Sequence, residues 1–122
     1  MTFQARVQIW VVQCFGRAVA VNSIERRSRF LEEALELFQA TGGTETDAVQ
    51  LIRYVFNRPM GDPTQEAGGA LLTLATLCTC FGIEMADAGE LELIRVLTHM
   101  EKIREKQASK VGRGVGAGSP LP

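Results

Sequence analysis

Apolar residues recur at steps of three and four along most of the chain, which is the spacing of amphipathic helices. The first such face consists of Phe3, Val7, Trp10, Val11 and Cys14. It predicts a first helix that ends near Gly16, with Trp10 and Phe15 in the core or in a subunit interface.

Two further apolar stripes predict a second and a third helix. The second helix has a cap at Asn22 or Ser23 and stops at Gly42-Gly43, and Asn22 with Glu25 three positions later is typical of a capping box. Its apolar face consists of Leu31, Ala34, Leu35 and Phe38. The third helix begins at Thr44, and its inward face consists of Ala48, Ile52, Val55 and Phe56.

The last two predicted helices follow a loop over residues 57–61. Asp62 caps the fourth helix, which has Pro63 at its first position and runs to about Gly82. The fifth begins near Glu84, and its apolar face consists of Leu93, Val96, Leu97, Met100 and Ile103. No useful alternating strand pattern occurs, so we expect an all-α fold, a four- to five-helix antiparallel bundle over residues 1–110. Residues 111–122, rich in Gly and Pro, are expected to form a flexible tail.

Composition and charge narrow the class of protein. The chain has 122 residues, 46% of them apolar, and a net charge of −1, which argues against binding a nucleic-acid polymer through bulk positive charge. The uncharged run over residues 67–83 falls short of the roughly 20 apolar residues of a membrane span. The N-terminus lacks the pattern of a signal peptide, and three cysteines without a disulfide framework suit a reducing compartment. We therefore expect a cytoplasmic protein that does not bind membranes.

Candidate chemistry begins with three acids on the second predicted helix. Glu32, Glu33 and Glu36 lie on one patch, away from the apolar face, because successive helical residues are about 100° apart. They are interpreted either as a solvated acidic surface, with Arg29 paired to Glu33, or as ligands of a cation.

Glu66 is the only charged residue of the fourth predicted helix. A helix that is apolar nearly all round is expected to be buried, and a buried carboxylate requires a cation. The alternative is a favourable interaction of Glu66 with the helix dipole. Oxygen ligands from two helices would suit Mg²⁺ or Mn²⁺.

The ordered set Glu32-Glu33-x-x-Glu36, a loop, and Glu66 at the start of an apolar helix resembles the MazG-like all-α nucleoside triphosphate pyrophosphohydrolases. The similarity extends from about Thr2 to Lys110, and the residues in and around these motifs resemble those of a branch of small phage and proteobacterial proteins. The resemblance implies hydrolysis of a nucleoside triphosphate to the monophosphate and pyrophosphate, with Mg²⁺ or Mn²⁺ as cofactor. It also implies a homodimer or homotetramer.

The resemblance assigns roles to particular residues of this chain. Glu33, Glu36 and Glu66 would be metal ligands. Glu32 would be a ligand through water or the base that orients the attacking water. The cations expected to contact the substrate phosphates are Arg29, Lys102 and Lys106.

One departure from the family pattern leaves an alternative function open. The aspartate expected three residues after Glu66 is Gly69. The chain is therefore either an enzyme with a reduced metal site or a non-catalytic helical module that binds a nucleotide or a protein partner. We also expect Gly68-Gly69 to form a close-contact surface for a neighbouring helix or a nucleotide.

Overall fold

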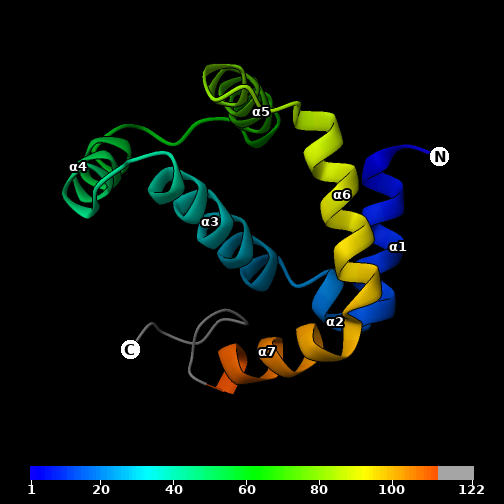
Figure 1. Cartoon of the computed structure of the whole chain (residues 1–122). Coiled ribbons are helices and arrows are strands. Elements are labelled where there is room, and N and C mark those ends of the chain that lie inside the picture. The colour runs from blue at the N-terminus through cyan, green and yellow to red at the C-terminus, as the bar shows by residue number, and fades with distance from the viewer. Residues whose placement is uncertain (113–122) are drawn as a thin grey trace. The chain divides into compact units, whose positions relative to one another are not determined.

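The computed structural model describes residues 1–112, and within that range every regular element is a helix (Figure 1). The helices are α1 (Phe3–Phe15), α2 (Arg17–Ala20), α3 (Ser23–Ala40), α4 (Glu45–Phe56), α5 (Pro63–Cys80), α6 (Met85–Thr98) and α7 (Met100–Gly112). The expected all-α class is confirmed. Of the expected tail, residues 111 and 112 belong to α7, and residues 113–122 lie outside the described residues.

The predicted helix caps are present at the expected residues. The Asn22 Oδ1 accepts the backbone N–H of Glu25 at 3.1 Å, ahead of α3. The Thr44 Oγ1 accepts an N–H of the first turn of α4, and the Asp62 Oδ2 does the same for α5, which has a proline in its first turn. Each cap satisfies an N–H that has no partner within its helix, so these boundaries follow from local chemistry.

The first predicted helix ends at Gly16, as expected, where φ is 85°. Two features differ from the prediction, and the first is the short helix α2, which follows Gly16 directly. The fifth predicted helix is two helices, α6 and α7, separated at His99. The Thr98 hydroxyl donates to the carbonyl of Ile94, and the His99 Nδ1 lies 2.9 Å from the carbonyl of Arg95. Side chains that bond to the preceding turn bend helices, and here the bend divides one predicted helix into two.

The chain forms two compact units, which are described separately. The first comprises Met1–Glu33 and the described part of Gly89–Pro122, and the second comprises Ala34–Ala88. In the first unit, α1 packs against α2 and α7. The buried apolar side chains of this unit are Val11, Cys14, Ala20, Leu93 and Val96. These side chains form a small core between the N-terminal and C-terminal helices of the unit, which are far apart in the sequence.

Polar contacts hold the helices of the first unit together. Arg6 of α1 makes a two-pronged ion pair with Glu90 of α6. A Cβ atom on Gly89 would lie 3.1 Å from the Phe3 ring, so the glycine allows α1 and α6 to approach closely. These contacts place α1 beside α6 (Figure 1).

The second unit leaves most apolar side chains exposed. The expected inward residues Ile52, Val55 and Phe56 of α4 are exposed, and on α5 Cys78 is the buried residue of this unit. Two expectations are therefore wrong for the single chain: that this face of α4 is buried, and that α5 is buried nearly all round. Cys80, the last residue of α5, is also exposed.

The glycine pair of α5 has no close neighbour. A Cβ atom built on Gly68 or Gly69 would have no described atom within 4 Å. No helix of the second unit therefore packs closely on this pair, contrary to that part of the expectation.

No single helix of the described chain combines the length and the apolar character needed to cross a bilayer.

Candidate functional site

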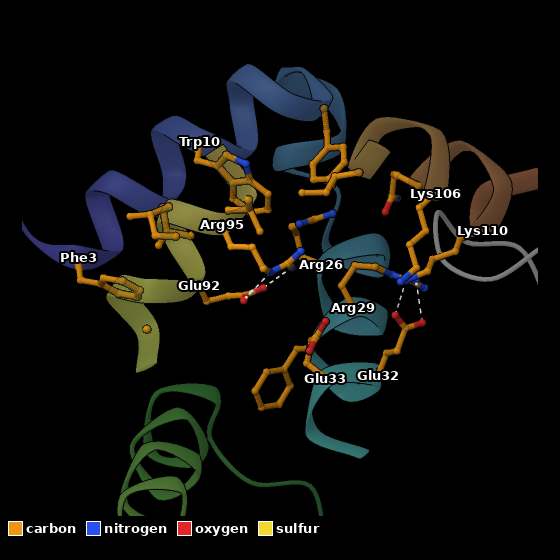
Figure 2. Close-up of a pocket in the computed structure, with 18 residues that line it drawn as sticks. Phe3, Trp10, Arg26, Arg29, Glu32, Glu33, Glu92, Arg95, Lys106 and Lys110 are labelled. Atoms are coloured by element: carbon orange, nitrogen blue, oxygen red, sulfur yellow. Dashed lines mark hydrogen bonds and ion pairs between the residues drawn. The ribbon is translucent and has the colours of Figure 1, made fainter. Parts of the chain in front are cut away.

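A cavity of about 670 Å³ lies within the first unit (Figure 2). Its aromatic lining consists of Phe3, Trp10, Phe15 and Phe30. Trp10 and Phe15 are in an edge-to-face arrangement with ring centroids 5.7 Å apart. Both residues were expected in the core or in a subunit interface, and the structure places them on a cavity wall.

The charged lining of the cavity is predominantly positive. Its five cationic side chains are Arg26, Arg29, Arg95, Lys106 and Lys110. Its three carboxylates are those of Glu32, Glu33 and Glu92, which leaves a net charge of +2. A concave surface of low polarity with excess positive charge attracts anions.

Glu32 is held by cations from two helices. The Arg29 Nη1 donates to Glu32 Oε2 at 3.2 Å, and the Lys110 Nζ of α7 donates to Oε1 (Figure 2). The Lys110 hydrogen bond is the main reason that the pKa of Glu32 lies below its ordinary value, and the charges of Arg29 and Lys106 act in the same direction. Glu32 is therefore an ionised carboxylate tied to α7.

Glu33 and Glu36 extend the acidic patch along α3. Each of Glu32, Glu33 and Glu36 offers an oxygen within 4.8 Å of the others. The charge of Glu33 also contributes to the raised pKa of Arg95, which is due first to a hydrogen bond with Glu92. Oxygens on a shared Mg²⁺ at about 2.1 Å are no more than roughly 4.2 Å apart, so the three carboxylates are grouped on the scale of a single cation site.

The other predicted site residues are distributed over both units. Arg29 and Lys106 line the cavity, whereas Lys102 is exposed on α7 and is not part of the lining. Glu66 is exposed in the first turn of α5, in the second unit, and is not one of the three grouped acids. The expectation that Glu66 is buried is therefore wrong, and the argument that its carboxylate requires a cation no longer applies.

Glu25 does not line the cavity, but it contacts residues that do, and sequence reasoning gave it only a capping role. Its side chain is 1% exposed, and Gln107 of α7 donates a hydrogen bond to its Oε1. Arg29 Nε lies 3.3 Å from the same oxygen. The predicted capping box is half formed. The backbone N–H of Glu25 donates to Asn22 Oδ1, but the Glu25 carboxylate lies in this buried cluster. The i,i+4 spacing of Glu25 and Arg29 was the available signal.

No protein-family model, curated protein or solved structure matches this chain.

Proposed function

We propose that the protein is a nucleoside triphosphate pyrophosphohydrolase of the MazG-like kind, dependent on Mg²⁺ or Mn²⁺. The observation that supports this most is the composition of the cavity in the first unit. Aromatic rings and an excess of cations line the same cavity, and a nucleotide has both a planar base and an anionic phosphate chain. Its volume of about 670 Å³ is ordinary for a site that binds a small molecule.

The proposed roles follow the charges around the cavity. Arg29 and Lys106 would bind the phosphates, with Lys102 a further cation on α7 that the resemblance implies. Glu33 and Glu36 would bind the metal, and Glu66 is the further ligand that the resemblance implies. A bound Mg²⁺ would neutralise phosphate charge and help to activate a water for attack on phosphorus.

Glu32 has two possible roles, and its environment favours one of them. A general base works best with a pKa near the operating pH. The hydrogen bond from Lys110 holds the pKa of Glu32 below its ordinary value instead. Glu32 is therefore proposed as a ligand through water that also orients Arg29 and Lys110.

The exposed apolar residues of the second unit support assembly. Large side chains exposed on α4 and α5 include Leu51, Ile52, Val55, Phe56, Leu71 and Leu72. Several large apolar side chains left exposed on neighbouring turns of one helix favour an interaction surface. We propose that a second copy covers it, in a homodimer or homotetramer, and that the protein acts in the cytoplasm without binding membranes or nucleic-acid polymers.

Gly69 supports a second candidate function. The chain lacks the aspartate of the family pattern at this position, so a non-catalytic module that binds a nucleotide or a protein partner is the alternative. The two candidates differ in turnover rather than in binding.

The test is pyrophosphate release from a panel of canonical and modified deoxynucleoside triphosphates with Mg²⁺ or Mn²⁺. We expect turnover by the natural chain, a loss of at least about 100-fold in Glu33→Gln and Glu36→Gln, and little change in Glu45→Gln. Glu45 is an acid in the first turn of α4, outside the α3 group. Nucleotide binding without turnover would instead identify the non-catalytic module.

A further inference from the structure

Glu25 is buried although it is charged. It is the largest side chain among the described residues that is less than 2% exposed. Removing a carboxylate from water costs free energy unless cations and hydrogen-bond donors surround it. A buried carboxylate on a helix next to a cavity therefore calls for a specific set of partners.

The partners of Glu25 converge on one of its oxygens. Gln107 donates to Oε1, Arg29 Nε lies 3.3 Å from it, and Arg26 Nη2 lies 3.8 Å from it. The other oxygen, Oε2, is buried without a hydrogen-bond partner among the described residues. One carboxylate thus faces two guanidinium groups, and the trio keeps a net charge of +1.

The same contacts define where the two arginines lie. The Arg26 guanidinium is stacked over the Phe15 ring at 5.6 Å from its centroid, and Arg29 spans Glu25 and Glu32. Both arginines line the cavity. Burial lowers the pKa of Arg26, and the charge of Glu25 opposes that effect.

The guanidinium groups retain donor capacity. Arg26 Nε and Arg29 Nη2 are buried without a hydrogen-bond partner in the described chain. Arg26 Nη2 and Arg29 Nε also make no hydrogen bond, but they face the Glu25 carboxylate as ion-pair partners. Guanidinium donors of this kind suit a phosphate, because the planar fork matches two oxygens.

We infer that Glu25, held by Gln107, is a positioning residue that fixes Arg26 and Arg29 on the cavity wall in the orientation that binds an oligophosphate chain. Glu25 itself does not touch the ligand. The inference rests on the nucleotide ligand of the proposed function and not on its hydrolysis.

A positioning role of Glu25 and a purely electrostatic effect of its charge predict opposite changes in anion affinity for Glu25→Gln. The variant removes a negative charge beside two cations, so electrostatics alone would tighten the binding of an anion. If the carboxylate orients the arginines, its loss weakens binding in spite of the added positive charge. The sign of the change therefore decides between the two accounts.

The experiment measures the affinity of the full chain for inorganic tripolyphosphate by titration calorimetry without metal. We expect Glu25→Gln to bind about tenfold more weakly than the natural chain, a difference that calorimetry resolves. Glu101→Gln is the control, because it removes one negative charge from an exposed residue of α7 that is not part of the cavity lining. This control should bind at least as tightly as the natural chain. Circular dichroism checks that each variant has the same helix content.

A second variant keeps the test decisive if Glu25→Gln does not fold. Gln107→Leu removes the donor that holds Glu25 and leaves both arginines and the carboxylate in place, so it should weaken binding by a smaller factor. Unchanged or tighter binding in the folded variants would overturn the inference, as would a natural chain that does not bind tripolyphosphate.

The pyrophosphate assay separates this inference from the proposed function. Weaker tripolyphosphate binding in Glu25→Gln, with no turnover by the natural chain, would support the positioning role and refute the enzyme. Turnover by the natural chain, with unchanged tripolyphosphate binding in Glu25→Gln, would refute the positioning role and support the enzyme.

Discussion

Arg104 of α7 donates its Nε–H to the carbonyl oxygen of Cys14, at 2.7 Å, where α1 ends. Its Nη2 donates to the carbonyl of Gln13 at 2.8 Å. The last carbonyls of a helix have no partners within it, and the negative end of the helix dipole favours a cation there. The contact joins two segments about 90 residues apart.

Replacing this arginine tests how α7 is held in the first unit. Arg104→Ala should lower the free energy of unfolding by about 1–2 kcal/mol, because two charge-assisted hydrogen bonds are lost. Urea denaturation measures the change, and Glu105→Ala, an exposed neighbour on α7, should stay within about 0.5 kcal/mol of the natural chain. Equal stability of Arg104→Ala and the natural chain would show that the contact contributes nothing.

The Glu32 contacts predict a pH dependence of stability. The folded state lowers the pKa of Glu32 below its ordinary value of 4.5, chiefly through the Lys110 hydrogen bond. The ionised carboxylate therefore stabilises the fold fully above that ordinary value, and this stabilisation is lost as the pH falls through the lower folded-state pKa. The natural chain should exceed Glu32→Gln in thermal midpoint at pH 7, and the difference should shrink below about pH 4.5.

The comparison should be made without added metal, so that only the ion pairs contribute. Glu45→Gln, which lies outside this network, should show no such pH-dependent difference. A constant gap between Glu32→Gln and the natural chain from pH 7 to pH 3 would contradict the prediction.

Gly69→Asp restores the acid of the family pattern. Because a Cβ atom there has no described neighbour within 4 Å, we expect the variant to fold, with helix stability changed by less than about 1 kcal/mol. The new carboxylate would lie one turn after Glu66 on the same helix. If a missing ligand is the only defect, Mg²⁺ should raise the thermal midpoint more than it does in the natural chain.

Gly69→Asn is the control for this variant, since it adds a side chain of the same size without the charge. An equal Mg²⁺ response in Gly69→Asp, Gly69→Asn and the natural chain would show that this position is no part of a metal site.

The exposed apolar surface predicts how assembly can be disrupted. Leu72 is 70% exposed on α5. Leu72→Glu should shift the protein towards monomer in sedimentation experiments at micromolar concentration, because a buried unpaired charge is costly in an interface. Thr64→Glu, in the first turn of the same helix, should sediment as the natural chain does. A natural chain that is itself monomeric would refute the proposed assembly.

Helices and their starts could be predicted because they depend on local contacts. The apolar spacing identified the helical class, and the caps at Asn22, Thr44 and Asp62 are present as predicted. Backbone hydrogen bonds of a helix join residues four apart, so the information lies within one segment. The break at His99 was missed because apolar spacing continues across it, while the bonds that bend the helix come from polar side chains.

The acids on α3 could also be located from the sequence, since helical spacing alone brings Glu32, Glu33 and Glu36 together. The partners that acids of α3 have on α7 could not be located in this way. Lys110 contacts Glu32 and Gln107 contacts Glu25 across 78 and 82 residues of chain, respectively. Such pairs depend on which faces of α3 and α7 pack together, and no periodicity within either helix encodes that choice.

The sequence by itself therefore determined the helices, their caps and the acidic face of α3, because each depends on neighbours within a few residues. Only the tertiary structure decided that Glu25 is buried, that Trp10 and Phe15 line a cavity, and that Arg26 and Lys110 belong to its charged wall. The physical reason is that burial and charge pairing are properties of packed surfaces. The free energy of a charged side chain is set by what surrounds it in space, which a local pattern does not specify.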